Sequence, residues 1–80
     1  MTKLEEKLIE LGYEFIDSCY NSHCYRKCIE GNGRVCINVC KGRIIGRYID
    51  KVIIHQQDID NLQQAFNQLQ KDLEVLENDK

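Results

Sequence analysis

Hydrophobic residues recur at helical spacing near both ends of the chain and alternate with polar residues in between. In the first segment three leucines recur every three or four residues, while Thr2 and Glu5 have the spacing of a capping box. Gly12 follows at a place where a left-handed C-cap residue is common. This pattern predicts a short helix at about residues 3–11.

The middle of the chain, from residue 13 to 54, alternates apolar with polar residues and is rich in Tyr, Val and Ile. Such alternation is typical of half-buried strands. Turn-forming residues interrupt it at 21–22, 31–33 and 41–42. We therefore expect an antiparallel meander of three or four strands.

The last segment has apolar residues spaced 3, 4, 3, 4 and 3 apart, which predicts a helix at about residues 56–78. At 1.5 Å per residue this helix would be roughly 34 Å long, whereas a typical strand is ~20 Å long. We expect its last turns to overhang the sheet, so that Leu69, Leu73 and Leu76 form a homodimer interface. Packing of the same stripe on the sheet is the alternative.

The predicted fold is α+β and consists of one domain, residues 1–80. An N-terminal helix precedes the meander, and the long C-terminal helix packs on one face of the sheet. No apolar run reaches the ~20 residues that span a bilayer, and the N-terminus lacks a basic region followed by a hydrophobic block. We therefore expect a cytoplasmic protein with no membrane partner, whose five cysteines stay reduced.

Four cysteines lie symmetrically about the glycine turn. If the turn is a three-residue loop at 31–33, Cys28 faces Cys36 and Cys24 faces Cys40 across a hairpin. The sequence thus predicts two cross-strand thiol pairs on one face of the sheet.

These thiols have three interpretations: zinc ligands, a redox switch, or small apolar side chains on a partly covered face. Zinc requires its sulfur ligands within ~2.3 Å of one point, but Cys24 and Cys28 on one extended strand would lie about 13 Å apart. We therefore predict no metal and no cofactor. The redox switch stays open, because directly opposed cysteines are close to disulfide distance.

Charge is distributed unevenly, since residues 18–51 carry seven Lys or Arg and two acids, while both ends are acidic. Alternation places one cluster of polar side chains on the same face as the thiols: Arg26, Arg34, Asn38, Arg43 and Arg47. Guanidinium groups suit phosphate or carboxylate partners. The cluster is either a binding site for an anionic partner or a solvated outer face.

No residue pattern indicates catalysis. His23 precedes Cys24 directly, and neighbours on a strand point to opposite faces, so this pair is badly placed for nucleophilic catalysis. The chain shows no Ser-His-Asp set, phosphate-binding glycine loop or metal-type carboxylate cluster. We therefore predict a protein that is not an enzyme.

Two stretches carry a resemblance to a group of proteins: LEEKLIELGY at residues 4–13 and QQDIDNLQQAF at residues 56–66. Both are similar to the ends of small uncharacterised proteins encoded by phages and mobile elements of low-GC Gram-positive bacteria. The order of helix, antiparallel sheet and helix also resembles several phage inhibitors of bacterial immunity, including anti-CRISPR proteins. The resemblance implies a binding protein that occupies the surface of a host factor.

Our first hypothesis is therefore a phage-encoded inhibitor of a bacterial defence system, which binds a bacterial host protein stoichiometrically. The alternative is a module that binds an anionic small molecule such as a nucleotide, or nucleic acid, on the arginine-bearing face. A third hypothesis is a zinc-stapled or redox-switched domain.

Overall fold

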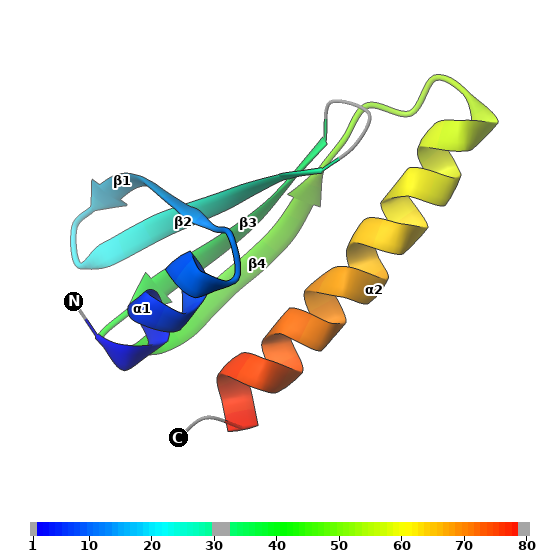
Figure 1. Ribbon diagram of the computed structural model, residues 1–80. Coiled ribbons are helices and arrows are strands. Elements are labelled where there is room, and N and C mark those ends of the chain that lie inside the picture. The colour runs from blue at the N-terminus through cyan, green and yellow to red at the C-terminus, as the bar shows by residue number, and fades with distance from the viewer. Residues whose placement is uncertain (1, 30–32, 79–80) are drawn as a thin grey trace.

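The computed structural model describes residues 2–29 and 33–78, apart from the side chains of Cys19 and Asn78. Two helices lie on the same face of a four-stranded sheet (Figure 1). In chain order the elements are α1 (Lys3–Glu10), β1 (Glu14–Cys19), β2 (Ser22–Ile29), β3 (Gly33–Cys40), β4 (Arg43–Asp50) and α2 (Gln56–Asn78). The α+β class and the meander with a long C-terminal helix are confirmed.

The first helix has the ends that its sequence predicts. The Thr2 side chain accepts a hydrogen bond from the Glu5 amide at 3.3 Å, and the Glu5 carboxylate accepts one from the Thr2 amide at 3.0 Å. These two bonds form a capping box, which satisfies amide groups that lack partners at a helix N-terminus. Gly12, just beyond the helix, has a φ of 98°, which a residue with a Cβ rarely adopts.

The sheet is an antiparallel meander of neighbouring strands in the order β1-β2-β3-β4. A two-residue turn joins β3 to β4, and both of its residues, Lys41 and Gly42, have positive φ, at 51° and 75°. This conformation matches the right-handed twist of a two-residue hairpin. The turn predicted at 41–42 is therefore confirmed.

The predicted pairing of thiols across the β2–β3 hairpin is wrong, because the two strands pair two residues away from the expected register. All four thiols keep their common face and are free. The residues opposite them are polar: Asn38 for Cys24, Arg34 for Cys28, Arg26 for Cys36 and Ser22 for Cys40.

The shift of register arises at Gly33, which belongs to β3 and pairs with Ile29 instead of forming part of the turn. The Ile29 side chain lies across Gly33, and a Cβ at this position would be 2.8 Å from the Ile29 Cδ1 atom. A side chain at this position would therefore require the Ile29 side chain to move. Residues 31 and 32 of the predicted turn lie outside the described residues.

A bulge interrupts β4 close to its start. Ile44 pairs with Val39, whereas Gly46 pairs with Asn38, so Ile45 is an extra residue with no partner in the register. A bulge of one residue reverses which face the following side chains occupy. Ile45 itself is largely exposed.

This reversal corrects the predicted binding cluster. Arg47 lies opposite Ile37, on the helix-covered face, and not beside the other arginines. Tyr48 lies opposite Cys36 and faces the open side. The adjacent apolar residues Ile44 and Ile45 break the alternation of the sequence at the place where the bulge lies.

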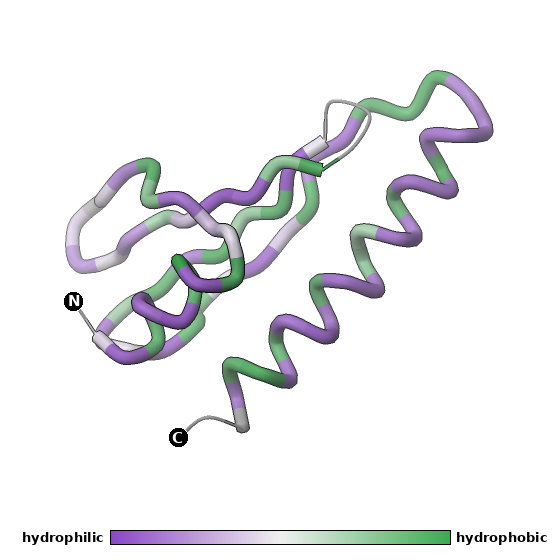
Figure 2. The backbone as a smooth tube through the Cα atoms, viewed as in Figure 1, coloured by the Kyte–Doolittle hydropathy of each residue, from purple (hydrophilic) through white to green (hydrophobic). Residues whose placement is uncertain are grey.

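The core lies between the sheet and both helices. Hydrophobic residues alternate with hydrophilic ones along α2, as Figure 2 shows. The buried side chains that form one cluster are Leu8, Tyr13, Tyr25, Val35, Ile37, Val39, Leu69 and Leu76. No helix in the described part of the chain is long and apolar enough to cross a membrane.

The expectation that the last turns of α2 overhang the sheet is wrong, because the three leucines of the predicted dimer interface pack within the chain. Leu69 and Leu76 are each only 5% exposed in the core, and Leu73 packs against it. The opposite half of α2 overhangs instead, with Ile59 and Phe66 each 47% exposed. The apolar stripe is thus mostly packed in the C-terminal half of the helix and partly exposed in the N-terminal half, where Ala65 is buried but Ile59 and Phe66 are not.

Candidate functional site

A groove of about 720 Å³ lies between α2 and the edge strand β4. Three consecutive residues of β4 line it, from Arg47 to Ile49. The α2 wall is mainly apolar and includes Ile59, Leu62 and Phe66. Most binding pockets for ligands or peptide segments share this size and this apolar lining with a few polar groups.

A buried carboxylate, that of Asp72, holds the C-terminal half of α2 in place beside the groove. Asp72, 3% exposed, accepts hydrogen bonds from the Tyr13 hydroxyl and the Gln68 amide, both at 3.0 Å. The Lys27 ammonium lies 3.5 Å from the same carboxylate and 5.3 Å from the centre of the Tyr13 ring. Burial and the nearby Asp72 raise the pKa of the Tyr13 phenol. These contacts fix the C-terminal half of α2 to β2 and to the loop between α1 and β1.

The N-terminal half of α2 has local contacts instead. The Asp58 carboxylate accepts hydrogen bonds from the amides of Ile54 and His55, at 3.0 and 2.9 Å, and these bonds lower its pKa. Lys51 lies 3.6 Å from Asp58. The Lys51 pair links the start of the helix to the residue that follows β4, whereas the other two bonds stay between its first turn and the residues just before α2. Two apolar side chains of this half, Ile59 and Phe66, are half-exposed along the groove.

Arg47 is the charged residue of the groove. Among the residues that the structure describes, no carboxylate lies within ion-pair distance of its guanidinium. Arg34, in contrast, lies 3.7 Å from Asp50. The groove therefore combines apolar walls with a positive charge whose partner the described chain does not supply.

Most of the predicted binding cluster lies on the face of the sheet that the two helices leave uncovered, which we call the open face. Arg26, Arg34, Asn38 and Arg43 share this face, whereas Arg47 does not. Acids lie among them, because Asp50 pairs with Arg34, and Glu14 lies opposite Arg26 in the register of β1 and β2. This mixture of charges weakens the interpretation of the open face as a site for nucleotides or nucleic acid.

The four described thiols differ in burial. Cys36 is buried and Cys28 is exposed, with Cys24 and Cys40 between them. Burial, and then the nearby Cys36, raise the pKa of the Cys24 thiol, which therefore stays protonated and weakly nucleophilic at neutral pH. Within residues 2–29 and 33–78, no three metal-ligating side chains lie close enough to hold a metal ion.

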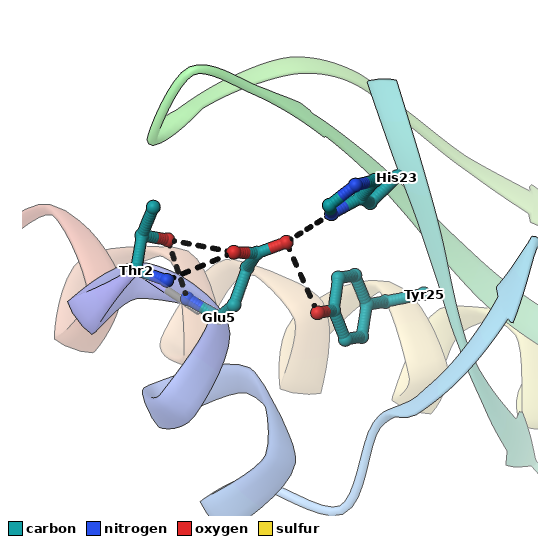
Figure 3. A network of polar contacts seen from close by, with 4 residues as sticks. All are labelled: Thr2, Glu5, His23 and Tyr25. Atoms are coloured by element: carbon teal, nitrogen blue, oxygen red, sulfur yellow. Dashed lines mark hydrogen bonds and ion pairs between the residues drawn. The ribbon is translucent and has the colours of Figure 1, made fainter. Parts of the chain in front are cut away.

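A polar network joins α1 to β2 around a buried carboxylate, that of Glu5 (Figure 3). One carboxylate oxygen lies 2.5 Å from His23 Nδ1 and accepts a hydrogen bond from the Tyr25 hydroxyl at 3.1 Å. The other oxygen accepts bonds from the amide and hydroxyl of Thr2, at 3.0 and 3.1 Å. The Thr2 amide and then His23 lower the pKa of Glu5 to about 2, while burial and Glu5 raise the pKa of Tyr25 to about 12.

The Glu5–His23 pair orients an imidazole whose side chain is 47% exposed. A nucleophile would complete the arrangement for covalent catalysis, but the adjacent Cys24 lies on the other face of β2. Phe15 packs against His23 with its ring edge-on, the centroids 5.5 Å apart. The network therefore acts as a connection between a helix and the sheet.

Sequence reasoning missed the groove and the buried Asp72. One signal was present in the sequence, since Asp72 falls within the apolar stripe of α2, three residues after Leu69 and four before Leu76. An acid in such a stripe indicates a buried, paired carboxylate. Lys27, on the covered face of β2, supplies the opposite charge.

Neither a scan against protein-family models nor searches of curated proteins and of solved structures gave a match. The basis for a functional assignment is therefore the geometry of the chain itself.

Proposed function

We propose that this chain is a binding protein without enzymatic activity, which acts by occupying the surface of a protein partner. The observation that supports this most is the apolar groove between α2 and β4. Ile59 and Phe66 expose almost half of their surface there, on a helix whose other half is firmly packed. Exposed apolar surface in a groove is typical of sites that bind other proteins.

We propose further that the protein is a phage-encoded inhibitor of a bacterial defence system and works in the cytoplasm of the host. The resemblance of its two terminal segments and of its order of elements to such small phage proteins supports this role. Stoichiometric binding fits a small domain that covers one surface of a larger host protein.

The test uses the full chain with an affinity tag, expressed in Gram-positive bacteria that carry defined defence systems. We expect a host protein to be retained at a fixed stoichiometry in native mass spectrometry. We also expect the expressed chain to raise the plating efficiency of a phage that the corresponding system restricts. Retention of no host protein, with unchanged plating for every system tested, would contradict the proposal.

Two variants of α2 locate the binding surface. Phe66→Ser removes an apolar side chain from the groove, and Val75→Ser removes one that is similarly exposed, at 45%, but lies outside the groove. We expect the first variant to lose the host protein and the rise in plating. The second variant should retain both, because its change in apolar surface lies elsewhere on the same helix.

A further inference from the structure

We propose that the groove receives an extended segment of the partner protein, which pairs with the outer edge of β4 as a fifth strand. The segment carries apolar side chains at alternate positions on the side of α2, with an acidic side chain near Arg47. This inference rests on the proposed function and adds the backbone conformation and the side-chain chemistry of the bound segment.

The edge of the sheet supplies the first argument. β4 is the last strand of the sheet and has eight residues, Arg43–Asp50. In the described part of the chain, no strand pairs with its outer side. The bulge lies near its start, so residues 46–50 form a regular stretch of edge. Unpaired amide and carbonyl groups on such an edge are a template for another strand.

The position of the groove supplies the second argument. It reaches three consecutive residues of β4, Arg47, Tyr48 and Ile49, although neighbouring side chains on a strand point to opposite faces. The groove therefore meets the edge of the strand and not merely one of its faces. A strand added there would lie ~4.8 Å from β4, with one row of its side chains directed toward Ile59 and Phe66.

Charge supplies the third argument, because Arg47 lies on the same side of the sheet as α2. Its cross-strand neighbour on an added strand would belong to the row that faces the helix. A carboxylate there would pair with the guanidinium, and the alternate residues beside it would contact apolar side chains of α2. A bound helix, in contrast, would leave the amide groups at the edge of β4 without protein partners.

The test begins with selection of random dodecapeptides, displayed on a carrier, against the immobilised full chain. Peptides that also bind Phe66→Ser are removed. We expect the remaining sequences to alternate apolar with variable residues, with Asp or Glu at one of the alternate positions. An enriched spacing of three and four residues, or the absence of Phe66-dependent peptides, would overturn the inference.

Backbone methylation of a selected peptide then distinguishes a paired strand from other modes of binding. In a paired strand only every second amide points toward β4. N-methylation of amides of one parity should weaken binding about tenfold per site, and methylation of the other parity should leave it unchanged. Equal effects at both parities would overturn the inference.

Arg47→Gln tests the charge pairing. It should weaken binding of the acidic peptide several-fold but should not weaken binding of the same peptide with Gln in place of its acid. Val75→Ser serves as the control and should bind both peptides as the unmodified chain does. Equal weakening of both peptides by Arg47→Gln would refute the charge pairing.

Sedimentation of the unmodified chain tests whether a second copy of the chain occupies the groove. A Phe66-dependent dimer would assign the groove to a second copy and would overturn the inference. Failure of the proposed function has a different signature, namely that no host protein is retained. If a host protein is retained through Phe66 while the peptide tests fail, the binding function stands and the added strand is rejected.

Discussion

The two halves of α2 belong to one regular helix but are held in different ways. In the C-terminal half, Leu69 and Leu76 are buried in the core, and Asp72 contacts Lys27 of β2 and Tyr13 of the loop before β1. In the N-terminal half, Ile59 and Phe66 are half-exposed beside β4. The groove also reaches the packed half, since Leu69 and Leu73 line it, but the half-exposed apolar side chains of its α2 wall belong to the N-terminal half.

The difference teaches that the anchoring of a helix depends on polar contacts as well as on its apolar stripe. The two buried carboxylates, those of Glu5 and Asp72, each join a helix to β2. Asp58, in the other half of α2, bonds to residues that shortly precede the helix, namely the amides of Ile54 and His55 and the Lys51 ammonium. A helix end whose polar contacts are all close in sequence and whose apolar side chains are exposed has low local stability and is available for a partner.

Matched truncations in the two halves should show the largest difference. Leu69→Ala removes a buried side chain of the core and should lower the free energy of unfolding by about 3 kcal/mol. Ile59→Ala removes a side chain that is half-exposed and should lower it by about 1 kcal/mol or less. Urea unfolding at pH 7 measures both values, and equal losses would show that the two halves are packed alike.

Acid should destabilise the network around Glu5. Its pKa is about 2 in the folded chain and near 4.5 in the unfolded chain, so the folded form favours the carboxylate. The resulting stability is fully present above about pH 4.5 and is lost as the pH falls through 2. We expect a contribution of up to about 3 kcal/mol.

Glu5→Gln isolates this contribution, because Gln does not titrate. Urea unfolding between pH 7 and pH 2.5 should show a steeper loss of stability in the unmodified chain than in the variant. Parallel pH profiles would mean that Glu5 titrates alike in the folded and unfolded chains.

Removal of the Asp72 charge should weaken the anchor of α2. Asp72→Asn replaces one of two acceptor oxygens with a donor and leaves Lys27 without its counter-charge, which should cost about 2 kcal/mol. Glu74→Gln, an exposed acid in the same half of the helix, should change stability by less than about 0.5 kcal/mol. Thermal unfolding of both variants gives the comparison, and similar melting temperatures would exclude Asp72 as an anchor.

The parts of the fold that depend on local sequence could be predicted from it. The capping box of α1, the turn at 41–42 and the extent of α2 follow from neighbouring residues, and the structure confirms them. The hairpin register could not be predicted, because the spacing of the residues does not decide whether Gly33 belongs to the turn or, as in the structure, to β3.

The face of the sheet on which Arg47 lies could not be predicted either. Two adjacent apolar residues, Ile44 and Ile45, do not by themselves indicate a bulge that leaves Ile45 without a partner. The overhang was predicted for the wrong end of α2. The lengths of helix and strand show that one end extends past the sheet, but they do not show which end is anchored. That anchor depends on contacts between Asp72 and residues far away in the sequence. The wrong face for Arg47 and the wrong overhang of α2 both affect the candidate site. The groove lies between α2 and β4, the strand that contains the bulge.

Loss of the hydrogen bonds that cap the start of α2 should have the smallest effect on stability. The effect should be confined to the N-terminal half of the helix. Asp58→Ala removes the acceptor for two amides and the counter-charge of Lys51 at the start of the helix, and it should lower the free energy of unfolding only modestly. Since tertiary contacts hold the other half, amide hydrogen exchange should accelerate in the first turns of α2 and stay unchanged around Leu69. Asp60→Ala removes an exposed acid of the same segment and should leave both regions nearly unchanged. Acceleration throughout the helix in Asp58→Ala would mean that α2 opens as a single unit, and the distinction between its two halves would then be rejected.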